Sequence, residues 1–175
     1  RYLPNVDAID LLDGMDYPNN YWFEAIPDET ERAVARARSN QGVAREALQI
    51  VANVVRNDRP FTEILTADYI MVNPYSAQVY GVNANFEDNA DPNEWAEAKL
   101  PGIPHAGLLT SHIWLNRFPT TATNRNRHRS RMVFKLFLAT DVLRLAERPI
   151  DQTAIAEFNP TRESEACTVC HANID

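Results

Sequence analysis

The sequence predicts a mainly α-helical fold: an irregular helical domain with an extended N-terminal arm and a short C-terminal helix. Two stretches with apolar residues at helical spacing, 33–55 and 127–145, predict its long helices. Prolines and a glycine interrupt residues 1–27, which predicts the arm. We therefore expect an arm over residues 1–27 and one helical domain over residues 28–175.

Length, net charge and the distribution of apolar residues limit the classes of protein to which this chain can belong. The chain has 175 residues and a mass of 19.9 kDa, enough for a domain with a hydrophobic core. Its formal net charge of −7 argues against nucleic-acid binding, which requires a basic surface. No apolar run approaches the roughly 18 residues that cross a bilayer. We expect neither a nucleic-acid partner nor a membrane span.

The first helical pattern begins at Asp28, a good N-cap residue, and Glu29 and Glu31 favour the first turn. The pattern ends near residues 56–58. Gly42 interrupts it, so the sequence predicts two helices or one broken helix.

Shorter elements are expected next. Residues 61–65 predict one helical turn, and residues 75–80 predict a helix that Gly81 closes as a C-cap. Residues 83–93, rich in Asn, Asp and Ala, predict a surface loop, and a short helix is expected through residues 95–98.

Residues 107–115 are the most apolar stretch in the middle of the chain. Helical spacing places Leu108, His112 and Leu115 on one face, so we expect His112 to point inward. The amphipathic helix expected over 127–145 is broad enough on its apolar side to be a central core element. That side comprises Met132, Phe134, Leu136, Phe137, Leu138, Val142 and Leu143.

Both cysteines lie in the last nine residues, in the pattern Cys167-x-x-Cys170-His171. This is the pattern of covalent c-type haem attachment. On one helical turn the two thiols point to the same side and can form thioethers with the vinyl groups of one porphyrin, and the next histidine can bind the iron. We expect one haem c on Cys167 and Cys170, with His171 as proximal ligand, so that the C-terminal helix is a haem-attachment helix.

Three other interpretations of the two cysteines remain open. A zinc site would take two of His105, His112 and His128, but structural zinc usually uses a second closely spaced pair of ligands. A thioredoxin-like redox pair would follow a strand, and the sequence predicts none before Cys167. A structural disulfide is possible in an exported protein.

The distal ligand of the haem iron has to come from elsewhere, because only four residues follow His171. It can come from upstream, from further sequence or from another subunit. His112 is the first candidate, because its apolar neighbours can wall a dry pocket. The other candidates are His105, His128, Met71 and Met132.

A basic cluster precedes and opens the helix expected at 127–145. Its members are Arg125, Arg127, His128, Arg129 and Arg131. The simpler interpretation is a solvated helix start. In the functional one, Arg127 and Arg131 clamp haem propionates or a partner's acidic patch, because guanidinium groups bind carboxylates in paired fashion.

The number of ligands on the haem iron distinguishes the possible functions. A six-coordinate, buried haem predicts an electron carrier with redox partner proteins, which is the function we expect. An open iron position predicts a peroxidase-like oxidoreductase. The aromatic residues of the N-terminal arm suggest a third possibility, a structural subunit of a haem-containing assembly that forms a homo-oligomer through the arm.

A series of short motifs resembles planctomycete-type cytochrome c-like proteins. The motifs are Ile64-Leu65-Thr66-Ala67-Asp68-Tyr69, Val72-Asn73, Tyr80-Gly81, Gly107-Leu108-Leu109-Thr110 and Cys167 to Asp175. The resemblance covers roughly residues 44–175. It implies a large, exported bacterial protein of several domains of unknown function, with haem and a periplasmic or extracellular location.

This chain departs from the family pattern at two places. Met132 follows Arg131 where the family usually has an Arg-Gly pair, and family members continue past the Ile-Asp pair that ends this sequence. We therefore expect the 175 residues to be part of a longer, exported polypeptide.

Overall fold

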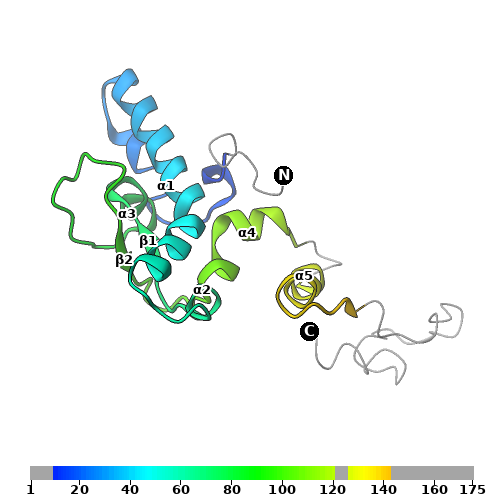
Figure 1. Cartoon of the computed structure of the whole chain (residues 1–175). Coiled ribbons are helices and arrows are strands. Elements are labelled where there is room, and N and C mark those ends of the chain that lie inside the picture. The colour runs from blue at the N-terminus through cyan, green and yellow to red at the C-terminus, as the bar shows by residue number, and fades with distance from the viewer. Residues whose placement is uncertain (1–9, 121–125, 143–175) are drawn as a thin grey trace, which may run out of the picture. The chain divides into compact units, whose positions relative to one another are not determined.

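The computed structural model describes residues 10–120 and 126–142. The chain divides into two compact units, residues 1–117 and 118–175 (Figure 1). The described residues of the first unit form two 3₁₀ helices in the arm, four α-helices, a third 3₁₀ helix and one two-stranded sheet, and those of the second form one α-helix. The predicted mainly α-helical fold is confirmed. No described helix is long and apolar enough to span a membrane.

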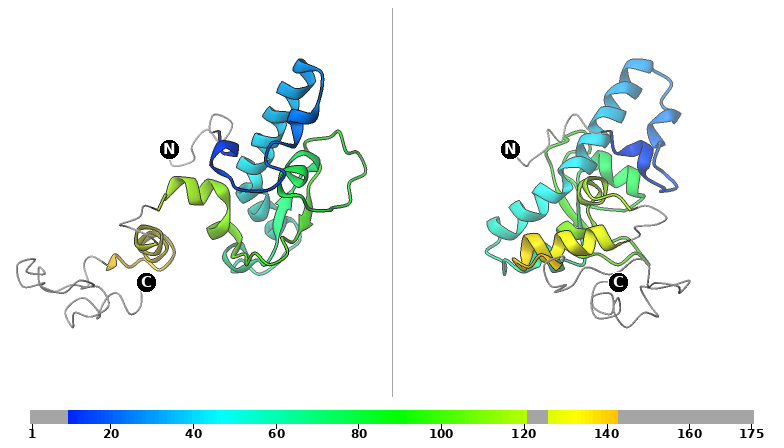
Figure 2. Two further views of the ribbon diagram at one scale, coloured as in Figure 1. Left: turned by 180° about the vertical axis from the view of Figure 1, so that it is seen from behind. Right: turned by 90° about the vertical axis from the view of Figure 1, so that its right-hand side faces the viewer.

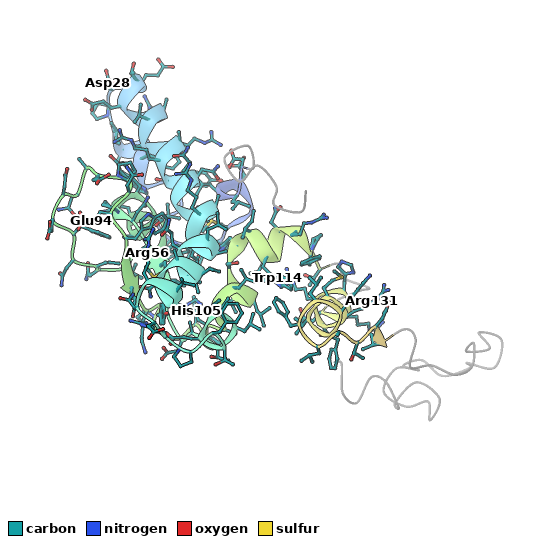
Figure 3. All side chains as sticks on the ribbon, in the orientation of Figure 1. Asp28, Arg56, Glu94, His105, Trp114 and Arg131 are labelled. Carbon is teal, nitrogen blue, oxygen red and sulfur yellow. The ribbon has the colours of Figure 1, made fainter. Side chains whose placement is uncertain are left out.

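Helix α1 (Glu29–Arg56) is the longest element of the first unit. Asp28 marks its start in Figure 3, and its side chain accepts a hydrogen bond from the backbone N–H of Glu31 at 2.8 Å, which confirms the predicted N-cap. The predicted break at Gly42 is wrong, because the helix runs through this residue. A glycine costs a helix about 1 kcal/mol relative to alanine, and here it leaves the room that a neighbouring helix needs.

That neighbour is helix α3 (Pro74–Tyr80), whose N-terminus is a capping box. The side-chain oxygen of Asn73 accepts from the N–H of Ser76 at 2.8 Å, and the hydroxyl of Ser76 accepts from the N–H of Asn73 at 2.9 Å. The predicted C-cap is confirmed, since Gly81 has the left-handed conformation with φ of 65°.

Strands β1 (Ile70–Val72) and β2 (Ala96–Ala98) pair antiparallel, with Met71 opposite Glu97. The short helix predicted through residues 95–98 is therefore wrong. Strand β1 is buried at all three positions, and its backbone groups need hydrogen-bond partners away from water. Residues 96–98 supply them as a strand.

The described part of the arm packs on its own unit. Its 3₁₀ helices η2 (Leu12–Gly14) and η3 (Trp22–Ala25) lie beside α1 in both views of Figure 2. The backbone N–H of Leu11 donates to the side chain of Asn40 at 2.8 Å, and the indole of Trp22 donates to Ser39 at 3.1 Å. Apolar arm side chains complete the core, namely Leu11, Leu12, Met15 and Phe23.

Residues 107–115 do not form the single helical face that was predicted. A short helix α2 (Glu63–Thr66) precedes β1, and the 3₁₀ helix η4 (Gly107–Thr110) packs beside it. Gly107 has φ of 48° and donates its N–H to the carbonyl of Ala67 at 2.9 Å. Ser111 is extended, and helix α4 (His112–Arg117) begins only after it. The docking of Gly107 thus separates Leu108 from the helix that carries His112 and Leu115.

In the second unit, helix α5 (Arg127–Phe137) is shorter than the predicted 127–145. Ala139 takes a left-handed conformation with φ of 50°, and the N–H of Thr140 bonds back to the carbonyl of Phe134 at 3.1 Å, which ends the helix. No residue of α5 is buried, so its predicted role as a central core element is wrong for the residues described. Val142 is buried, and Leu143 lies outside the described residues.

Candidate functional site

The expected haem-attachment residues Cys167, Cys170 and His171 lie outside the described residues. Covalent attachment and the proximal ligand therefore stay predictions. The same holds for the alternatives of a disulfide, a thioredoxin-like pair and a cysteine-containing zinc site. Within residues 10–120 and 126–142, no group of three or more His, Cys, Asp or Glu side chains is arranged to hold a metal ion.

The described residues bring another set of polar groups together, which we call the Glu46–Tyr80–His112 cluster. Glu46 lies on α1 and is only 2% exposed, and Tyr80 is the last residue of α3 and 5% exposed. The hydroxyl of Tyr80 lies 2.7 Å from Oε2 of Glu46 and 3.0 Å from Nδ1 of His112. One phenol thus connects a buried carboxylate to an imidazole.

Local structure explains how each member reaches the cluster. Glu46 falls on the same face of α1 as the buried residues Val43 and Ile50. Gly81 ends α3 directly after Tyr80. The extended backbone at Ser111 makes His112 the first residue of α4. The prediction that His112 points inward is confirmed.

Aromatic rings enclose the cluster. Tyr17, from the N-terminal arm, presents its ring edge-on to Tyr80, with centroids 5.1 Å apart and an interplanar angle of 90°. The ring of Tyr17 also lies 5.6 Å from that of His112, and the rings of Tyr80 and His112 are 5.7 Å apart. Edge-on packing of this kind stabilises aromatic pairs beyond simple burial. The arm therefore closes the cluster on one side.

Burial determines the electrostatics of the three groups. It raises the pKa of Glu46 to about 7, against the hydrogen bond from Tyr80, which favours the ionised form. Burial, followed by the nearby His105, lowers the pKa of His112 to about 4. Burial, followed by the charge of Glu46, raises the pKa of Tyr80 well above its ordinary value. At neutral pH the imidazole and phenol are neutral, and the carboxyl group is the one that titrates.

The number of protons fixes the direction of the hydrogen bonds. Tyr80 has a single hydroxyl proton, and an ionised Glu46 can only accept. When Glu46 is ionised, the phenol donates to Oε2 and the Nδ1 of His112 must carry a proton to bond to the phenol oxygen. In that state the second ring nitrogen of His112, Nε2, carries the lone pair.

The other candidate ligands have different surroundings. His105 (Figure 3) has both ring nitrogens buried without a hydrogen-bond partner in the described part of the chain, and burial lowers its pKa against the opposing charge of Asp68. His128 belongs to the second unit, where it packs 5.6 Å from the ring of Phe118. Met71 is buried in β1, and Met132 is half-buried on α5.

The predicted carboxylate clamp is partly engaged within the chain. Arg131 donates from Nε and Nη2 to the two oxygens of Asp141, at 3.1 and 3.2 Å. Arg129 donates to the carbonyl of Phe118 at 2.8 Å. Arg127 is half-buried at the start of α5, and Arg125 lies outside the described residues. The guanidinium of Arg131 thus already binds a carboxylate in the paired geometry expected of it.

Sequence reasoning missed Glu46, Tyr80 and Tyr17. One signal was available: Glu46 interrupts the apolar face of the helical pattern at 33–55, and carboxylates are rarely buried without a partner. Nothing in the sequence paired it with Tyr80, which lies 34 residues further along the chain.

Comparison with known proteins gives one match. Residues 19–82 match the sequence profile of a family described as PSD4, a protein of unknown function (DUF1592). No curated protein and no solved structure matches the chain. The matched segment contains Glu46 and Tyr80 and stops before His112. Residues 19–82 are thus similar to a domain family whose function is unknown.

Proposed function

We propose that this chain is part of a c-type haem protein that transfers electrons outside the cytoplasm. The observation that carries the proposal is the pattern Cys167-x-x-Cys170-His171. In this proposal the two thiols hold one haem c, His171 is the proximal ligand, and redox proteins are the partners. The haem supplies reversible one-electron chemistry, which the protein tunes through ligands, burial and nearby charge.

The match to the family of unknown function supports the relation to planctomycete-type cytochrome c-like proteins, because it overlaps the resembling motifs over residues 44–82. In the described residues those motifs serve the fold. Asn73 caps α3, Gly81 ends it, and Gly107 docks η4 on α2. The upstream motifs therefore support a shared fold, while the haem proposal depends on the C-terminal motif.

His112 remains our first candidate for the distal ligand. It is half-buried and neutral, and metals bind the neutral imidazole. Its Nδ1 is taken by Tyr80, so coordination would use Nε2. A ring whose other nitrogen has a hydrogen-bond partner is oriented as metal-bound histidines usually are. Arg127 and Arg131 stay the candidates for propionates, Arg131 in competition with Asp141.

The test is a pyridine haemochrome spectrum of the full-length protein, produced in a host that attaches c-type haem. We expect one haem c per chain. Replacing Cys167 and Cys170 by alanine should abolish attachment, whereas the matched change His128→Ala should leave the yield unchanged. Full-length protein that emerges without covalent haem from a host that loads a control cytochrome would overturn the proposal.

A further inference from the structure

Tyr80 has the surroundings that oxidation of a tyrosine requires. A phenol that loses one electron becomes a strong acid, and inside a protein its proton has to pass to a base that is already hydrogen-bonded to it. Oε2 of Glu46 lies 2.7 Å from the phenol oxygen, within the range of a short O–H···O bond. The proton can therefore leave without movement of either side chain.

We propose that Tyr80 is a redox-active tyrosine that gives up one electron and one proton together. The electron passes to a peroxide-derived one-electron oxidant, which is reduced. The O–H bond of Tyr80 breaks, and its proton forms an O–H bond with the carboxylate of Glu46. The products are a neutral phenoxyl radical and a neutral carboxylic acid.

The products suit this site better than the reactants do. Before the step the site buries an anion, and burial of a charge without a countercharge is costly. After the step no charge is buried. The radical oxygen then accepts hydrogen bonds from the new O–H of Glu46 and from the Nδ1–H of His112.

Three other described tyrosines lack either burial or a strong carboxylate base that is hydrogen-bonded to the phenol. Tyr69 donates to Glu63 at 2.8 Å, but Arg59 also bonds to Glu63, at 3.0 Å. The bonds from Tyr69 and Arg59 lower the pKa of Glu63 and so weaken it as a base. Tyr21 bonds to Asp13 but is 41% exposed, and the phenol of Tyr75 accepts from the cationic Arg38.

Enclosure by neighbouring rings favours a long-lived radical. Tyr80 is almost completely buried, which keeps a radical there from meeting another radical or solvent reductants. The half-buried ring of Tyr17 packs against it edge-on and offers the adjacent aromatic group through which an electron can leave. This site goes beyond the proposed function, because it requires no haem.

The experiment oxidises the full-length chain with a flash-generated ruthenium(III) polypyridyl and follows the phenoxyl radical by absorption and electron paramagnetic resonance. Measurement starts after the radicals on exposed tyrosines have decayed, at a pH above 7 so that Glu46 is ionised. We expect a persistent radical that Tyr80→Phe removes. Tyr69→Phe, a matched change at another buried tyrosine, should leave it unchanged.

Glu46→Gln tests the base separately, because glutamine keeps the shape and an acceptor oxygen but cannot take the proton. Radical formation should slow by at least about a hundredfold, the lower end of what a positioned base contributes. The solvent deuterium isotope effect on the rate of radical formation should also differ between Glu46→Gln and the parent protein. A persistent radical that survives Tyr80→Phe, or an unchanged rate in Glu46→Gln, would overturn the proposal. If Tyr80→Phe does not fold, the Glu46→Gln comparison decides alone.

Discussion

Gly42 of α1 lies directly against Asn73, the N-cap of α3. A Cβ atom added at Gly42 would be 2.6 Å from Oδ1 of Asn73 and 2.9 Å from the Cβ of Ser76. The same Oδ1 accepts hydrogen bonds from the backbone of α3 at 2.8 and 3.1 Å. The absence of a side chain at Gly42 therefore allows the capping box of α3 to pack on α1.

Gly42→Ala is expected to destabilise the first unit. Overpacking costs about 1–3 kcal/mol and the gain in helix propensity offsets about 1 kcal/mol of it, so we expect a net loss of up to about 2 kcal/mol. Urea unfolding followed by tryptophan fluorescence measures it. Gly14→Ala is the control, because a Cβ there meets nothing within 4 Å. A Gly42→Ala protein that gains the full helix-propensity term of about 1 kcal/mol over the parent would contradict the close packing of α1 and α3.

Gly107→Ala should be more damaging than Gly42→Ala. The residue has φ of 48°, and its added Cβ would overlap the backbone carbonyl of Ile64, which cannot rotate away. Gly102→Ala is a matched control, since Gly102 also has positive φ, of 77°, but faces open space. The left-handed conformation alone costs about 1–2 kcal/mol for alanine. Equal losses of unfolding free energy in the two variants would show that the clash is absent.

The Glu46–Tyr80–His112 cluster predicts two opposing effects of pH on stability. The pKa of Glu46 rises from 4.5 to about 7 on folding, so the folded state holds an extra proton in this window and stability falls as pH rises through it. The pKa of His112 falls from 6.5 to about 4, so there the unfolded state holds the extra proton and stability rises with pH. Each effect is of the order of 3 kcal/mol.

Single substitutions should expose each effect, because the two largely cancel between pH 4.5 and 6.5. Relative to the parent protein, Glu46→Gln should gain stability as pH rises from 4.5 to 7, and His112→Asn should lose it from pH 4 to 6.5. Denaturant unfolding at a series of pH values gives both curves. Variants whose curves run parallel to that of the parent would show that neither group titrates as described.

His112→Ala tests the distal ligand in the haem-loaded, full-length protein. If Nε2 of His112 binds the iron, the ferric absorption spectrum should change from low-spin to high-spin. His105→Ala, in the same unit, should leave the spectrum as it is. An unchanged low-spin spectrum in His112→Ala would exclude His112 as the ligand, and peroxide turnover by the parent protein would favour the peroxidase-like alternative over the electron carrier.

The sequence by itself determined the features that depend on neighbouring residues. Asp28 as N-cap, Gly81 as C-cap and the mainly helical class followed from residues a few positions apart, because caps and helical turns are made within one or two turns of chain. The haem prediction is of the same local kind, since the pattern from Cys167 to His171 is complete within five residues of sequence.

Only the tertiary structure decided what depends on segments far apart in the chain. The sequence alone predicts a helix break at Gly42, whereas the structure shows that Gly42 makes room for Asn73. Residues 96–98 form a strand because the buried strand β1 needs a hydrogen-bonding partner. The phenol of Tyr80 meets Glu46 and His112 across 34 and 32 residues of sequence. Helical periodicity shows which face of an element is buried, but it does not show which other element covers that face.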